Sequence, residues 1–148
     1  MKATRQILVP TDFSQYADEA LQEGLFLAKQ FNAHLHLLHV VPDLKQCAED
    51  YCFSDEYVKQ FRTSGVEASK QKLKSELDKY PESKDVQITT HVRLGRPDDE
   101  ILKEEKEKSI DLIVIASHGR TGFLEHLIGS VADRVTRGAK CDVLLVKA

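Results

Sequence analysis

The most informative stretch of the chain is Asp111-Leu-Ile-Val-Ile-Ala-Ser-His-Gly119-Arg-Thr-Gly122-Phe-Leu-Glu-His-Leu-Ile-Gly129-Ser130. Its apolar first part predicts a strand buried on both faces, and the glycine-containing segment after it predicts a loop. A helix-like segment begins at Gly129-Ser130. A strand, a loop and a helix N-terminus in this order can hold a phosphate, because bare N–H groups approach the anion and the helix dipole favours negative charge.

The same residues also have a purely structural interpretation. Ser130 followed by Asp133 resembles a capping box with Asp in place of the usual Glu or Gln, and a cap alone explains both residues. Gly119 and Gly122 can likewise be turn glycines. The chain has no G-x-x-x-x-G-K-[ST] and no G-x-G-x-x-G after its first strand, which argues against a P-loop enzyme and a dinucleotide fold. The spacing alone does not decide between a helix cap and a phosphate site.

Strand-like and helix-like patterns alternate along the rest of the chain. Strands are predicted at 7–10, 35–41, 86–94, 112–116 and 143–146, the third near a sheet edge because one of its faces is polar. Helices are predicted from a Ser14 cap to an Asn32 stop, from about Tyr57 to Tyr80, from Pro97, and from Ser130 to Arg137 with Gly138 as C′ residue. Residues 43–56 have no clear period and predict a loop.

This alternation predicts an α/β fold over residues 1–148 as a single domain, with one open parallel sheet and helices on both faces. Such sheets bind ligands at the carboxyl ends of their strands. The first strand ends at Pro10-Thr11-Asp12 and the fourth at Ser117-His118-Gly119, so both ends face one crevice if the strands are neighbours. Asp12 can alternatively form an Asx-turn after its strand.

Other candidate sites are weaker. His34 and His36 lie on one strand face, but no acid or cysteine near them in sequence completes a metal site. His118 is interpreted as a loop or ligand contact and not as a catalyst, because neighbouring strand-end side chains point opposite ways and Ser117 would not reach it. The three cysteines, Cys47, Cys52 and Cys141, have neither zinc nor thioredoxin spacing and predict free thiols in a reducing cytoplasm.

Composition excludes several classes of protein. The chain has 148 residues, a net charge of −3 and no basic run, so nucleic-acid binding is not expected. No apolar stretch has the length of a signal peptide or a membrane span. We therefore expect a cytoplasmic protein without a membrane contact.

The chain resembles the universal stress protein family over nearly its whole length. The resemblance rests on Ile7-Leu-Val-Pro-Thr-Asp-Phe-Ser14, on Leu37-Leu-His-Val-Val41, on Gly95-Arg-Pro97 and on the span from Asp111 to Lys147. The nucleotide-binding branch of the family carries the motif G-x2-G-x9-G-[ST]. Gly119, nine further residues, Gly129 and Ser130 match its second half, and Ala116 replaces its first glycine. If that position needs a positive φ, alanine would cost about 1 kcal/mol or more.

The resemblance implies a five-stranded sheet of order 3-2-1-4-5 of the adenine-nucleotide alpha-hydrolase-like, Rossmann-like type. It also implies ATP, with Mg²⁺ or Mn²⁺ held through its phosphates, across the ends of strands one and four. Asp12 would bond the ribose, Arg120 would supply charge, and Ser130 would supply a hydroxyl. The implied binding residues are Pro10, Thr11, Asp12, Val40, Val41, Ala116, His118, Gly119, Arg120, Gly129, Ser130 and Val131.

The expected function is that of an ATP-binding regulatory protein of the stress response, with slow hydrolysis at most. Two alternatives stay open: a family member that acts only through protein contacts, which Ala116 favours, and a weak ATPase or adenylating enzyme. The apolar final strand, Val143-Leu-Leu-Val146, would lie at a sheet edge in this strand order and predicts a homodimer formed through that edge.

Overall fold

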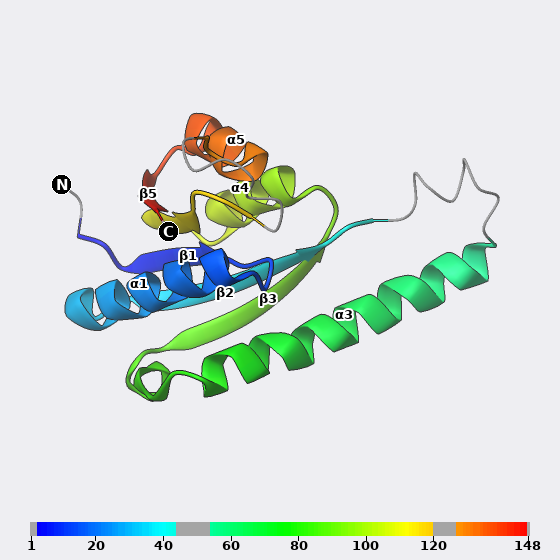
Figure 1. The fold of residues 1–148 in the computed structure, drawn as a ribbon, viewed down its shortest axis with the longest axis horizontal. Coiled ribbons are helices and arrows are strands. Elements are labelled where there is room, and N and C mark those ends of the chain that lie inside the picture. Colours follow the sequence, from blue (N-terminus) through cyan, green and yellow to red (C-terminus); the bar gives the residue numbers. More distant parts are fainter. Residues whose placement is uncertain (1–2, 44–53, 120–126, 148) are drawn as a thin grey trace.

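The structure is a computed structural model that describes residues 3–43, 54–119 and 127–147. Five parallel strands form one sheet in the order β3-β2-β1-β4-β5 (Figure 1), which confirms the predicted fold class and strand order. The strands are β1 (Gln6–Pro10), β2 (His34–Val41), β3 (Ile88–Leu94), β4 (Leu112–Ala116) and β5 (Asp142–Val146).

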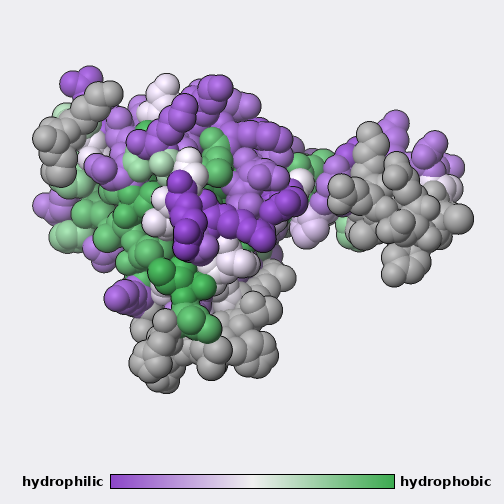
Figure 2. Space-filling model, turned by 90° about the horizontal axis from the view of Figure 1, so that it is seen from above, coloured by the Kyte–Doolittle hydropathy of each residue, from purple (hydrophilic) through white to green (hydrophobic). Residues whose placement is uncertain are grey.

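Helices cover both faces of the sheet. On one face lie α1 (Gln15–Phe31), α3 (Asp55–Asp78) and a short 3-10 helix, η1 (Pro81–Asp85). On the other lie α4 (Pro97–Glu107) and α5 (Ser130–Gly138). The first turns of α3 extend away from the rest of the protein (Figure 1). The surface seen from above carries both hydrophilic and hydrophobic side chains (Figure 2).

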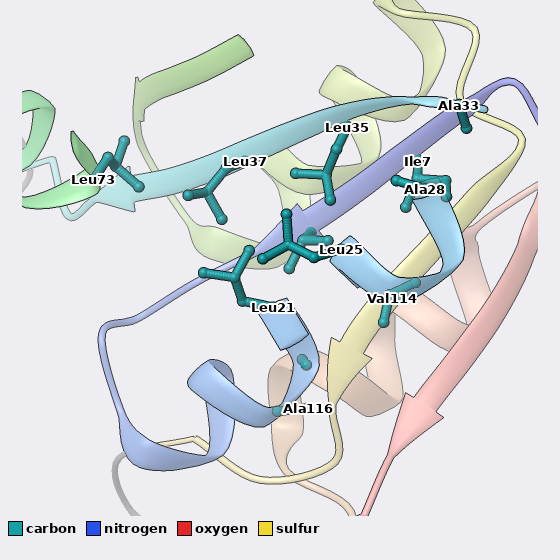
Figure 3. Packing of buried hydrophobic residues seen from close by; sticks show 12 residues of the cluster. Ile7, Leu21, Leu25, Ala28, Ala33, Leu35, Leu37, Leu73, Val114 and Ala116 are labelled. Atoms are coloured by element: carbon teal, nitrogen blue, oxygen red, sulfur yellow. The ribbon is translucent and has the colours of Figure 1, made fainter. Parts of the chain in front are cut away.

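Alternation along the inner strands divides the core into two clusters. Ile7 and Val9 of β1 join Leu21 and Leu25 of α1 on one face, whereas Leu8 joins the α4 and α5 side. Figure 3 shows the side chains of α1 directed at those of the sheet on the first face. β4 contributes to both clusters, as its continuous apolar run predicts for a strand covered on both sides.

Several element boundaries differ from the sequence-based predictions. Ser54 caps α3 by accepting a hydrogen bond from the N–H of Tyr57 at 3.1 Å, so the helix begins inside the segment that was predicted as loop up to residue 56. Gly138 is the last residue of α5 and not a left-handed C′ residue, because the C-cap Ala139 is extended. A Cβ at Gly138 would lie 2.8 Å from Cδ1 of Leu102, so close helix packing accounts for this glycine.

Hydrogen-bonded polar side chains around the buried His36 join β1, β2 and β3 on the second face. Nε2 of His36 lies 2.8 Å from Oε1 of Gln6, and Nδ1 lies 3.0 Å from Nε2 of His91. Because an amide oxygen only accepts, Nε2 of His36 carries the ring proton. Burial, and then the neighbouring His34 and His91, lower the pKa of His36 to about 4.

We expect this histidine to make the protein less stable in mild acid. The unfolded chain takes up a proton below its ordinary pKa of 6.5, whereas folded His36 stays neutral down to about 4, so stability falls as pH drops through that window. Between pH 7.5 and pH 5 the loss should be about 2 kcal/mol. Urea unfolding of wild type and His36→Gln at both pH values measures it. An equally steep pH dependence in the two proteins would contradict the assignment.

Candidate functional site

A pocket of about 270 Å³ opens at the carboxyl ends of β1, β2 and β4. This volume is near the lower end of the range for small-molecule sites, about 300 Å³. From β1 the chain adds β2 and β3 on one side of the sheet and then β4 and β5 on the other side. The pocket lies at this switch point, between β1 and β4, where open α/β sheets bind ligands. Its lining comes from both strand ends, from α4 and from the start of α5.

The turn after β1 forms one wall of the pocket. Its backbone is fixed by the N–H of Thr11, which donates to the Leu38 carbonyl at 2.8 Å, and by the N–H of Ser14, which donates to Oδ1 of Asp12 at 2.9 Å. The second bond forms the Asx-turn, which is the alternative interpretation of Asp12. The other carboxylate oxygen of Asp12, Oδ2, lies 3.0 Å from the position of a Cβ at Gly119, so the same carboxylate also reaches the segment after β4.

The two described ends of the glycine loop meet at the opposite wall. The N–H of Gly129 donates to the Ser117 carbonyl at 2.7 Å. A Cβ at Gly129 would lie 3.4 Å from that oxygen and 3.6 Å from the Gly119 nitrogen. These are ordinary van der Waals distances, so the approach of α5 to the end of β4 leaves room for a side chain at position 129. Arg120 lies outside the described residues.

The start of α5 differs from the predicted capping box. Gly129 is the N-cap, with φ −60° and ψ 154°, and as a glycine it has no side chain with which to cap the helix. Ser130 occupies the first helical position, one residue too late to cap, and Asp133 instead accepts a hydrogen bond from Nε of Arg137 at 2.9 Å. The first residues of α5 line the pocket, so the N-terminus of this helix, which favours an anion, stands at the pocket.

His118 and Ser117 lie closer together than the sequence predicted. Oγ of Ser117 is 2.9 Å from Nδ1 of His118, so the expectation that the two side chains point apart was wrong. β4 ends at Ala116, and the alternation of a strand does not extend to the two residues after it. Ser117 is buried, at 3% exposure, and only His118 of the pair lines the pocket.

The structure brings most of the candidate binding residues together. Pro10, Thr11, Asp12, Val40, Ala116, His118, Gly119, Gly129, Ser130 and Val131 all line the pocket. Val41 does not line it, because successive strand side chains point to opposite faces and Val41 faces α3, 3.4 Å from a Cβ position at Gly65. The φ of Ala116 is not positive, so alanine in place of the first motif glycine causes no backbone strain.

Sequence reasoning missed part of the lining. Ile101 and Pro97 come from α4, and no local pattern shows that this helix lies over the strand ends. His39 directly precedes Val40 and could have been included with it. The full set of additional residues is Ala17, Leu38, His39, Pro97, Ile101, Ile115 and Ala132.

Metal ligands and thiols give little further chemistry. Within residues 3–43, 54–119 and 127–147, no group of three His, Cys, Asp or Glu side chains could hold a metal ion. Burial, and then the nearby Glu105, raise the pKa of the Cys141 thiol to about 12, which keeps it protonated. Cys47 and Cys52 lie outside the described residues.

In the part of the chain that the structure describes, no helix is both long and apolar enough to span a membrane.

Known proteins match the chain over nearly its full length. The universal stress protein MJ0531 of Methanocaldococcus jannaschii is 35% identical over 147 residues, which cover 97% of this chain and 82% of the relative. The universal stress protein YxiE of Bacillus subtilis is 32% identical, with 96% and 98% covered. The solved structure of UspA from Lactobacillus plantarum superposes with a TM-score of 0.82 at 23% identity, over 99% of this chain and 100% of that one.

Two further solved structures with the same fold contain nucleotides. One is a universal stress protein in complex with cAMP, with a TM-score of 0.68 at 23% identity over 99% of this chain and 98% of the other. The second, from Archaeoglobus fulgidus, is in complex with dAMP, with a TM-score of 0.61 at 19% identity over 99% and 100%. The sequence model of the universal stress protein family matches residues 3–147, and with the relatives above 30% identity it shows that this chain belongs to the universal stress protein family.

Proposed function

We propose that this protein binds ATP as a signal and acts as a single-domain, cytoplasmic regulator of the stress response. The observation that carries the proposal is the meeting of the Thr11-Asp12 turn with Gly119, Gly129 and Ser130 around one pocket. The cAMP and dAMP complexes of two fold neighbours support an adenine nucleotide as the ligand.

Each part of the pocket suits one part of the nucleotide. Oδ2 of Asp12 faces the Gly119 side of the pocket, where a carboxylate can accept from ribose hydroxyls. The N–H groups at the start of α5 and the hydroxyl of Ser130 suit the phosphates. Backbone groups of Val40 and Val41 would bind adenine, and Arg120 would add positive charge at the phosphates. Mg²⁺ or Mn²⁺ would be held through the phosphates.

Hydrolysis of the bound nucleotide should be slow. Asp12 is the one carboxylate among the described lining residues, and its Oδ1 already accepts from the Ser14 N–H. His118 also lines the pocket, but its Nδ1 lies 2.9 Å from Oγ of the buried Ser117 and is directed at that hydroxyl. Rapid hydrolysis would need a base placed to activate water. A weak ATPase or adenylating activity is therefore the lesser candidate. A family member that acts only through protein contacts is the other, and the observation that favours it is Ala116, which lines the pocket where the family motif has its first glycine.

Calorimetric titration with Mg-ATP and Mg-GTP tests the proposal. We expect saturable binding of ATP and much weaker binding of GTP. The absence of binding at millimolar nucleotide would contradict the proposal and favour action through protein contacts.

We also expect a homodimer formed through β5. This strand is at the edge of the sheet, and Leu144 on it is 36% exposed, so its open backbone groups and apolar side chains suit pairing with a second copy. Leu144→Lys should shift the protein to a monomer in sedimentation velocity at micromolar concentration. Phe61→Lys is the matched control, because Phe61 is exposed on α3, which packs on β3 and β2 at the other end of the sheet. A wild-type monomer, or the same dimer in both variants, would count against the interface.

A further inference from the structure

The turn that presents Asp12 to the pocket contains a strained residue. Phe13 has φ 63°, a left-handed conformation that bulky L-residues avoid. Its N–H donates to Oγ1 of Thr11 at 3.0 Å, and the next N–H, of Ser14, donates to Oδ1 of Asp12 at 2.9 Å. Strain of this kind persists only when surrounding contacts hold the residue in place.

Two contacts hold the Phe13 ring, one on the sheet and one on a helix. The imidazole of His39 on β2 lies against it, with ring centroids 4.4 Å apart and an interplanar angle of 42°. The ammonium group of Lys72 on α3 lies 4.5 Å from the ring centroid, within the range of a cation–π interaction. The next residue of α3, Leu73, is fully buried in the core and fixes this turn of the helix against the sheet.

The stack is also bonded to the turn it supports. Nδ1 of His39 donates to the Thr11 carbonyl at 2.8 Å, and since a carbonyl only accepts, Nδ1 carries the proton. His39 thus contacts both the residue before Asp12 and the one after it. Contacts run without a break from Lys72 on α3, through Phe13 and His39, to Thr11 and Asp12 at the pocket.

We propose that Lys72, Phe13 and His39 are positioning residues that hold the Asp12 carboxylate in its binding orientation, so that α3 sets how strongly the pocket binds the ribose. Lys72 does not line the pocket. It acts by keeping the Phe13 ring on His39 and the turn in its strained conformation. The inference rests on the proposed function, because it assumes that Asp12 contacts ribose hydroxyls.

The test compares ATP with 2′,3′-dideoxy-ATP, which lacks the hydroxyls that Asp12 would bind. Wild type should bind ATP at least tenfold more tightly than the dideoxy nucleotide, as expected for hydrogen bonds to a carboxylate. Lys72→Met removes the charge and keeps most of the side-chain length. It should weaken ATP binding about threefold, the size of an exposed cation–π contact, while leaving dideoxy-ATP binding unchanged.

Matched variants separate positioning from general damage to the protein. Lys72→Arg keeps a cation over the ring and should restore the wild-type preference. Lys74→Met removes an exposed lysine of the same helix and should leave both affinities unchanged. Phe13→Ala should reduce the ATP preference further, and Phe13→Tyr, which keeps the ring, should retain it. Damage to folding alone would weaken both nucleotides equally and leave the ratio of their dissociation constants unchanged.

The outcomes distinguish a failure of the proposed ATP binding from a failure of the positioning role. Wild type that fails to bind ATP would overturn the proposed function and this inference with it. Wild type that binds and prefers ATP, with an unchanged ratio in Lys72→Met and Phe13→Ala, would overturn the inference alone. A reduced ratio in Lys72→Met that Lys72→Arg restores would support the positioning role.

Discussion

Replacing Gly129 by aspartate should abolish ATP binding and leave the fold intact. The new carboxylate would stand at the N-cap of α5, beside the N–H groups proposed to bind the phosphates. Two like charges about 4 Å apart near a protein surface repel by about 4 kcal/mol, so the affinity should fall by more than a hundredfold. Among the described residues, the atom nearest to a Cβ at Gly129 is the Ser117 oxygen at 3.4 Å, an ordinary contact distance, so the backbone there has room for a side chain.

Gly129→Asn is the matched control for this prediction, because it adds a side chain of the same size without charge. It should weaken ATP binding far less than Gly129→Asp does, as measured by calorimetry, and circular dichroism should show both variants folded. A folded Gly129→Asp protein with wild-type affinity would show that the phosphates bind elsewhere.

Replacing Arg93 by methionine should cause a large loss of stability, about 3–5 kcal/mol. The guanidinium donates to Glu100 and Glu104 at 2.7 Å each, and Glu104 is only 2% exposed. Without Arg93, two buried carboxylates between β3 and α4 would lose their main partner. The loss should grow as pH rises, because an unpaired buried carboxylate favours its protonated form while the unfolded chain ionises.

Urea unfolding at pH 5 and pH 8 measures this effect. The double variant Arg93→Met, Glu104→Gln should recover part of the stability, because it removes the buried charge together with its partner. Lys29→Met breaks an ion pair with Asp85 in which both side chains are more than half exposed, and should change stability by less than about 1 kcal/mol. A loss as small in Arg93→Met as in Lys29→Met would contradict the argument.

The order of elements could be predicted from the sequence because each carries its own pattern. Continuous apolar runs identified the central strands, and Ser14, Asn32 and Pro97 marked helix ends where the structure places them. These signals are local, so they are visible in a single chain. The strand order came from the family resemblance, since periodicity does not say which strands are neighbours.

The features that could not be predicted from the sequence depend on contacts between distant segments. The local pattern at Gly138 predicts a helix stop, whereas the structure shows that this glycine lets α5 approach Leu102 of α4. His39 was overlooked because its partners, Phe13 and Lys72, lie on other elements. The Ser130-Asp133 spacing resembles a capping box, but the N-cap is Gly129, and a one-residue shift of a helix start is not visible in the local pattern.

Chemical-shift mapping by NMR during a titration with Mg-ATP tests the central claim most directly. The amide signals of Thr11, Asp12, Gly119 and Ser130 should shift in a saturable way, together with that of Val131, whereas those of β3 and η1 should stay in place. Mg-GTP at the same concentration should cause much smaller shifts. If Mg-ATP produced no saturable shifts at these amides, or produced them on another surface, the pocket at the ends of β1 and β4 would not be the nucleotide site.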